Sequence, residues 1–189
     1  MKVKIFLTSV VVGVTGLSIG IGCGATTPQV QSAETKEVAI LPQDYRYYYD
    51  VPLSISEQDD IREVCLDFGV EEPLVYAVIM HESDFQKDLI DGQDWGLMQI
   101  NECNHERFIS EGVTLFLDVK QNVYCGVSLL SGYLKKYDSV EKALMCYNLG
   151  ETGARAEWKK GITHNSYTDT ILMDYAHIKD TGRYLCHND

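Results

Sequence analysis

The sequence predicts a mostly helical domain with at most one small β-hairpin. Beyond about residue 53, apolar residues recur at the three- and four-residue spacing of amphipathic helices. Hardly any stretch alternates apolar and polar residues with the period of two that marks a half-buried strand. The composition, 45% apolar and 23% charged residues, is that of a globular domain with a hydrophobic core.

Two helices are predicted first. One begins after Ser56, which has the spacing of a capping box with Asp59, and it ends at Gly69. Pro73 suits the first turn of the next helix. Residues 74–80 are apolar on all sides, so we expect this second helix to be buried. The apolar face of the first helix is formed by Ile61, Val64, Cys65 and Phe68.

Three further helices follow a loop region. They begin after Asp118, after Ser139 with an end near Gly150, and around Ser166. Any sheet should be a small hairpin between Asp84 and Leu117. The apolar stripes are Val119, Val123, Val127, Leu130 and Leu134 in the first of these helices, and Ile171, Leu172, Tyr175 and Ile178 in the last.

The N-terminus has the features of an export signal. Lys2 and Lys4 precede an uncharged apolar stretch over residues 5–21. Residues 20–23 resemble a bacterial lipoprotein signal, in which Cys23 would become the lipidated first residue. A cleaved signal, a lipidated Cys23 and an uncleaved membrane anchor are the three alternatives.

The chain therefore divides into three predicted parts. Residues 1–23 are the export or lipoprotein signal, residues 24–52 a polar tether, and residues 53–189 the folded domain. We expect that domain outside the cell or in the cell envelope, with a possible membrane tether through the N-terminus. Four tyrosines near the end of the tether should either pack on the edge of the domain or stack on a sugar: Tyr45, Tyr47, Tyr48 and Tyr49.

The charge of the chain excludes one class of partner. Lys and Arg number 16 against 28 Asp and Glu, a formal net charge of -12. Such a protein repels a phosphate backbone, so no nucleic-acid partner is expected.

The sequence also lacks complete motifs for binding a metal ion. Phe85 stands where a zinc-protease signature begun by His81 and Glu82 needs its second histidine. Residues 88–94 lack the ligand spacing and closing glutamate of a calcium loop. We expect no cofactor and no metal.

Glu82 is the main candidate for chemistry. A carboxyl group at the end of an apolar helix is either a desolvated functional acid or an exposed terminal charge. The segment over residues 94–101 favours the functional interpretation, because polar Gln99 and Asn101 flank an apolar residue there.

Four motifs in order carry a family resemblance. They are His81-Glu82-Ser83, Gly96-Leu97-Met98-Gln99-Ile100-Asn101, Cys146-Tyr147-Asn148-Leu149-Gly150, and Tyr167. Their order and separations resemble the soluble-lytic-transglycosylase domain, a relative of goose-type lysozymes, from about residue 53 to residue 172. The helix after Asp118 is similar to the central helix of that family. The resemblance implies a lysozyme-like helical domain with a glycan cleft, which cuts the β-1,4 bond between N-acetylmuramic acid and N-acetylglucosamine in peptidoglycan.

The resemblance also implies roles for single residues. Glu82 would be the only general acid/base, in a reaction that forms 1,6-anhydro ends. Peptidoglycan glycan strands would be the partner, and we expect a monomer. The implied substrate-binding residues are Ser83, Gln99, Asn101, Tyr147, Asn148 and Tyr167.

Two other functions are open at this point. One is a hydrolase of the same bond, in which Asp84, Asp91 or Asp94 positions water opposite Glu82. The other is an inactive glycan-binding component of a secretion or conjugation apparatus, although glycan binding alone would need no acid.

The cysteines divide into two groups. We expect Cys65, Cys125 and Cys146 to be unpaired, buried small residues on helices. Cys103 and Cys186 fall outside regular helices, and export would permit a disulfide between them. A metal site joining them with His105 and His187 has nothing else to support it.

Overall fold

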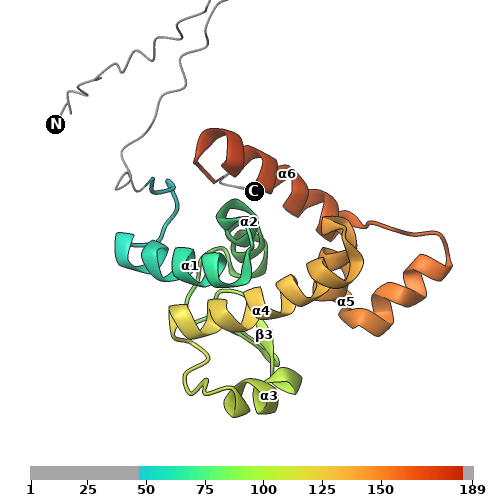
Figure 1. The fold of residues 1–189 in the computed structure, drawn as a ribbon, viewed down its shortest axis with the longest axis horizontal. Coiled ribbons are helices and arrows are strands. Elements are labelled where there is room, and N and C mark those ends of the chain that lie inside the picture. The colour runs from blue at the N-terminus through green and yellow to red at the C-terminus, as the bar shows by residue number, and fades with distance from the viewer. Residues whose placement is uncertain (1–46, 185–189) are drawn as a thin grey trace, which may run out of the picture. The chain divides into compact units, whose positions relative to one another are not determined.

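The computed structural model describes residues 47–184, so the predicted export signal and the tether up to residue 46 lie outside the described part. The fold of this part is mostly helical, as predicted, with six α-helices, one 3-10 helix and a three-stranded sheet (Figure 1). The helices are α1 (Ile55–Phe68), α2 (Glu72–Ser83), α3 (His105–Ser110), α4 (Val119–Tyr137), α5 (Val140–Lys159) and α6 (Ser166–Thr181), with η1 at Glu102–Asn104. The strands are β1 (Ile90–Asp91), β2 (Asp94–Trp95) and β3 (Ile100–Asn101).

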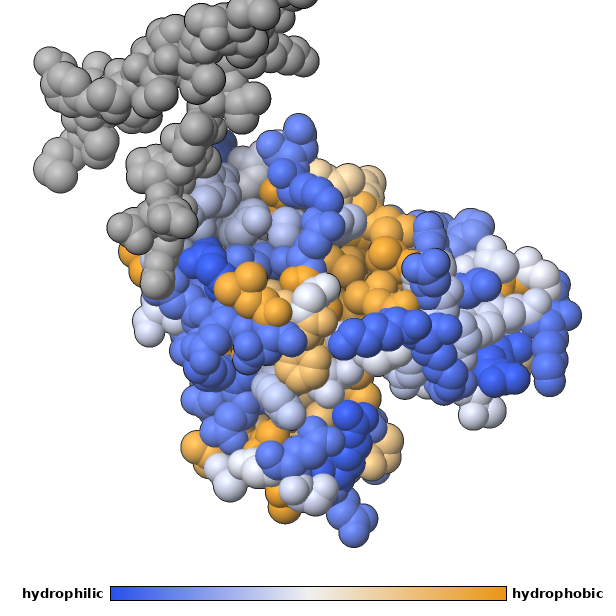
Figure 2. Space-filling model, in the orientation of Figure 1, coloured by the Kyte–Doolittle hydropathy of each residue, from blue (hydrophilic) through white to orange (hydrophobic). Residues whose placement is uncertain are grey.

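The central helix of the core is α2. Every residue from Pro73 to Met80 is buried, which explains why this segment is apolar on all sides. The main helix pairs are α2 with α6, α1 with α4, and α4 with α5, and α2 lies between α1 and α6 in Figure 1. On the face shown in Figure 2, hydrophilic side chains lie mostly toward the periphery and apolar residues gather near the middle. Within residues 47–184, no helix combines the length and the apolarity that crossing a bilayer requires.

The first helix begins earlier than the sequence analysis placed it. The N-cap is Ser54, not Ser56: the Ser54 hydroxyl accepts a hydrogen bond from the Glu57 amide, and the Glu57 carboxylate accepts one from the Ser54 amide. Glu57 is long enough to reach back in this way. The Asp59 carboxylate instead accepts hydrogen bonds from Tyr48 and Arg62.

Helix α5 extends past its predicted end. Gly150 has φ 67° and ψ 159°, which interrupts the helix as predicted, but a helix resumes and continues to Lys159. Glycine is suited to this backbone conformation because it has no Cβ. Beyond the kink, Ala154 is buried in a small apolar cluster with Met145 and Cys146. The two helical segments on either side of the kink therefore pack against each other through this cluster.

The sheet lies where the hairpin was predicted. It is an antiparallel meander in which Ile90 pairs with Trp95 and Asp94 pairs with Asn101. Each strand has two residues, and there are three strands where one hairpin was expected. The pairing of Asp94 with Asn101 matters for the site described below.

Tyr48 and Tyr49 pack on the edge of the domain, which agrees with the first of the two interpretations, and Tyr45 lies outside the described residues. The Tyr48 hydroxyl donates to the Asp59 carboxylate at 3.1 Å, and the Tyr49 amide donates to the Gln58 side chain at 2.9 Å. Residues 47–52, assigned to the tether from sequence, thus contact α1.

The helical cysteines behave as small apolar residues. Cys65, Cys125 and Cys146 are buried and free, as predicted. Burial raises the pKa of Cys65 and of Cys125 to about 12, so both remain thiols. Cys103 is free and exposed, and Cys186, the partner considered for it, lies outside the described residues.

Helix α4 packs tightly against the loop after β2 at one glycine. A Cβ at Gly126 would lie 2.4 Å from the Met98 sulfur, whereas one at Gly132 on the same helix would meet nothing within 4 Å. We expect Gly126→Ala to lower the free energy of unfolding by about 1–3 kcal/mol, because the buried Met98 must move. Gly132→Ala should raise it by about 1 kcal/mol or less through helix propensity. Urea denaturation of the two variants tests this, and equal stabilities would contradict the packing argument.

Candidate active site

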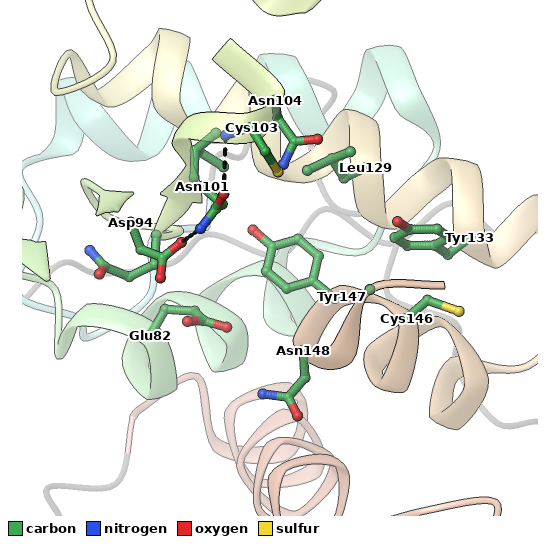
Figure 3. Close-up of a pocket in the computed structure, with 13 residues that line it drawn as sticks. Glu82, Asp94, Asn101, Cys103, Asn104, Leu129, Tyr133, Cys146, Tyr147 and Asn148 are labelled. Carbon is green, nitrogen blue, oxygen red and sulfur yellow. Dashed lines mark hydrogen bonds between the residues drawn. The ribbon is translucent and has the colours of Figure 1, made fainter. Parts of the chain in front are cut away.

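A cleft of about 430 Å³ lies where α2, the sheet, α4 and α5 meet (Figure 3). Among the residues that the structure describes, its lining includes two carboxylates, four side-chain amides and no Lys, Arg or His. Amides and aromatic rings suit a neutral, hydroxyl-rich ligand such as a sugar. The lining residues are Glu82, Asp94, Gln99, Ile100, Asn101, Cys103, Asn104, Leu129, Tyr133, Cys146, Tyr147, Asn148 and Gly150.

The last turn of α2 carries Glu82 into this cleft. The buried residues 73–80 fix the helix in the core, and α2 ends at Ser83 with Asp84 in the left-handed conformation at φ 48°. Glu82 is half-buried. Burial raises the pKa of Glu82 to about 7, a hydrogen bond from Tyr167 opposes this shift, and the charge of Asp94 adds to it. Near neutral pH, Glu82 can therefore both donate and accept a proton.

Tyr167 holds one oxygen of the Glu82 carboxyl group. It lies in the first turn of α6, after the N-cap Asn165, and it is buried. Its hydroxyl donates to Glu82 Oε1 at 2.5 Å. Burial, and then the charge of Glu82, raises the pKa of Tyr167 far above its usual range, so the phenol keeps its proton. The edge-to-face contact of Tyr167 with His81, 4.8 Å between ring centroids, fixes the ring further.

Ser83 lies behind the cleft. It is 3% exposed, and its hydroxyl donates to the Leu97 carbonyl at 2.9 Å and lies 3.1 Å from the Ile79 carbonyl. It ties the end of α2 to the loop after β2, and it is absent from the described residues that line the cleft.

Asn122 on α4 organises the same loop, and the sequence analysis gave it no role. Its side-chain oxygen accepts from the Met98 amide at 2.8 Å, and its nitrogen donates to the carbonyls of Trp95 and Phe116, each at 2.7 Å. Gly96, at φ 77°, makes this possible, because a Cβ there would lie 2.3 Å from the Asn122 nitrogen. A polar residue beside the apolar stripe of a central helix is the signal that could have indicated it.

Gln99 and Tyr147 form the part of the cleft next to this loop. Gln99 has φ 45°, and its side-chain nitrogen donates to the Gly96 carbonyl at 2.7 Å. The Tyr147 hydroxyl donates to the Met98 carbonyl at 2.7 Å, which joins α5 to the loop. Asn148, the next residue on α5, is exposed in the cleft, and the described residues offer its side chain no recorded hydrogen bond.

Asn101 is bound to one of the three candidate aspartates. Its nitrogen donates to Asp94 Oδ1 at 2.8 Å, while its oxygen accepts from the Cys103 amide at 3.0 Å (Figure 3). Asp84 and Asp91 are exposed and do not line the cleft, so Asp94 is the aspartate that the fold brings to Glu82.

Three lining residues were not anticipated. Leu129 and Tyr133 lie one turn apart on α4, and Asn104 ends η1. Their separation along the chain from the motifs explains why no local pattern indicated them. Within residues 47–184, no group of three His, Cys, Asp or Glu side chains is placed to hold a metal ion.

Comparison with known proteins decides the family. The model of the Transglycosylase SLT domain family matches residues 60–169, which include Glu82, Tyr147 and Tyr167. The chain belongs to this family. The resemblance inferred from the four motifs is therefore confirmed.

The fold of this SLT domain is similar to that of a solved structure, an inactive mutant of lytic transglycosylase Slt from Pseudomonas aeruginosa. The TM-score is 0.54 and the sequence identity 17% over 69% of this chain. The chain covers only 27% of the length of that protein. The likeness supports the lysozyme-like fold predicted from the motifs.

Proposed function

We propose that this SLT domain is a peptidoglycan lytic transglycosylase with Glu82 as its single general acid/base. The observation that carries the proposal is the state of Glu82: a half-buried carboxyl with a pKa of about 7, held by Tyr167 in a cleft lined by amides and aromatic rings. Such a pKa lies near neutral pH, where one group serves best as acid and then as base.

In the first step, protonated Glu82 donates its proton to the glycosidic oxygen as the bond from carbon one of N-acetylmuramic acid to that oxygen breaks. The departing chain leaves with a new hydroxyl group, and positive charge develops at carbon one. The N-acetyl group of the sugar can stabilise this charge, as in substrate-assisted glycosidases.

In the second step, the Glu82 carboxylate takes the proton of the hydroxyl at carbon six of the same sugar. The oxygen of this hydroxyl bonds to carbon one, so a 1,6-anhydro ring closes and Glu82 regains its proton. No water is consumed. Tyr167 holds Oε1 throughout, and no described residue donates a recorded hydrogen bond to Oε2, the oxygen that we assign to proton transfer.

The similar Slt protein supports the role of a glutamate. Its inactive form carries a change of one glutamate to glutamine.

The N-terminal sequence fits the same function. Peptidoglycan lies outside the cytoplasmic membrane, so its cleavage requires the export that residues 1–23 predict. We propose a location in the cell envelope, with Cys23 lipidation or an uncleaved anchor as the possible attachments.

Hydrolysis of the same bond is the second candidate, since Asp94 lines the cleft with Glu82. The products of the two reactions differ by one water.

Digestion of two polymers tests the proposed substrate. We expect the full chain to release soluble fragments from purified peptidoglycan, and none from chitin, which contains N-acetylglucosamine but no muramic acid. Comparable release from both polymers, or from neither, would contradict the proposal.

A further inference from the structure

Two carboxyl groups share the cleft without a cation to balance them. Glu82 comes from the end of α2 and Asp94 from β2, and the described lining contains no Lys, Arg or His. Figure 3 shows the two side chains near each other on one side of the cleft. A neighbouring negative charge disfavours ionisation of a carboxyl group, most strongly where water is partly excluded.

Asp94 is held in place by Asn101. The two residues face each other across the β2–β3 pairing, and the Asn101 side chain donates to Asp94 Oδ1 at 2.8 Å. Asn101 is fixed in turn, because its oxygen accepts from the Cys103 amide at 3.0 Å as the N-cap of η1. Both hydrogen-bonding groups of the Asn101 amide are thus used within the protein, one of them to orient Asp94.

The tyrosines around Glu82 do not supply a negative charge that would disfavour ionisation of Glu82. Tyr167 on α6 and Tyr147 on α5 are phenols whose pKa values burial raises well above the usual range, so both are neutral. His81 precedes Glu82 on α2 and packs edge-on against Tyr167. Further along α6, Asp174 is fully buried. Among residues 47–184, the neighbouring charge that acts on Glu82 is that of Asp94, which adds to the larger effect of burial in favouring the protonated form of Glu82.

We propose that Asp94, clamped by Asn101, is a positioning residue whose negative charge adds to the effect of burial in keeping Glu82 protonated in the resting enzyme. This inference rests on the proposed function, because only an enzyme that begins with acid catalysis needs the protonated form. It gives Asp94 an electrostatic role through Glu82 in place of water activation. It also gives Asn101 a different role from the predicted one: Asn101 orients Asp94 and does not bind the substrate.

The test is the pH dependence of kcat/KM on peptidoglycan. Activity should fall as pH rises through the pKa of Glu82. Asp94→Asn keeps the shape and an oxygen for Asn101 but removes the charge, so this alkaline limb should move to lower pH by about half a unit or more. At about pH 5, where Glu82 is protonated in both proteins, the ratio of kcat/KM of wild type to that of Asp94→Asn should be smaller than at neutral pH.

Two matched variants accompany this one. Asp91→Asn removes the same charge from the paired position on β1, outside the cleft, and should leave the limb unmoved. Asn101→Ser keeps a capping oxygen for the Cys103 amide but cannot reach Asp94, so a smaller shift in the same direction is expected. A carbon-13 NMR titration of the Glu82 carboxyl, assigned by comparison with Glu82→Gln, should show the same displacements without depending on activity.

Several results would overturn the inference. One is an unmoved limb and an unmoved Glu82 titration in Asp94→Asn. Another is a loss of more than about tenfold at every pH in a folded Asp94→Asn protein, which would place Asp94 in the reaction itself. If Asp94→Asn does not fold, an unmoved titration in Asn101→Ser would count against the clamp. The proposed function fails separately, if the wild-type profile has no alkaline limb and Glu82→Gln still cleaves the glycan.

Discussion

Glu82→Gln should reduce kcat/KM on peptidoglycan by about a hundredfold or more, because general acid catalysis typically contributes at least that factor. Glutamine keeps the shape of the side chain and an oxygen to accept the hydrogen bond from Tyr167. It loses only the transferable proton. The measurement is the initial rate of soluble fragment release at neutral pH, with the thermal midpoint as a check on folding.

The pH dependence of stability gives a second readout for the same variant. The pKa of Glu82 is raised from 4.5 to about 7 in the folded protein, so the folded state holds this proton more tightly than the unfolded state. Wild type should therefore lose stability from this group as pH rises from about 4.5 to about 7, and Glu82→Gln should not.

A matched glutamate provides the control. Glu106 is exposed on α3, outside the cleft lining, and Glu106→Gln should leave activity unchanged. More than about a tenth of wild-type activity in Glu82→Gln would remove Glu82 from the role assigned to it.

Among the substitutions proposed for this protein, Asn122→Ala should cause the largest decrease in the free energy of unfolding. Asn122 is 1% exposed and makes three hydrogen bonds to the backbone of the loops that surround the site. Alanine would leave the buried Met98 amide and two carbonyls without these partners, a cost of about 2–5 kcal/mol in the free energy of unfolding. Activity should fall as well, because this loop positions Gln99 and the Met98 carbonyl that accepts a hydrogen bond from Tyr147.

Urea denaturation and the rate of fragment release measure the two effects. Gln121→Ala, the neighbouring change, is the comparison: Gln121 accepts hydrogen bonds from the Thr114 and Leu115 amides at the exposed surface and should cost less. A loss of stability in Asn122→Ala no greater than that in Gln121→Ala would show that the buried amide does not organise the loop.

Much of the fold was predictable because helix periodicity is a local property. The apolar run in α2 predicted its burial. The position of Glu82 just beyond that run left two alternatives, a desolvated acid or an exposed charge, and the structure shows the first. Helix α3 was missed because it is six residues long with one buried side chain, Phe108, which gives no periodic pattern. The start of α1 was misplaced because two capping sequences overlap, and side-chain length decided between them.

The motifs identified which residues belong to the site. They did not predict the hydrogen-bond partners that determine the role of each residue. The sequence placed Ser83, Asn101 and Tyr147 together, yet Ser83 and Tyr147 donate to the backbone of the loop and Asn101 binds Asp94. Asn122 joins this network from a helix more than twenty residues away. Such roles depend on the pairing of distant segments, which a local pattern does not contain.

The most direct test of the account is digestion of peptidoglycan in water enriched in oxygen-18, followed by mass spectrometry of the fragments. If Glu82 acts alone, the hydroxyl at carbon six attacks carbon one, because a well-oriented intramolecular group can reach an effective concentration of about 10⁵ M. The account predicts 1,6-anhydro ends that are lighter by one water than hydrolysis products and carry no oxygen-18. Reducing ends that contain one oxygen-18 atom would contradict it and would show that water is the attacking group.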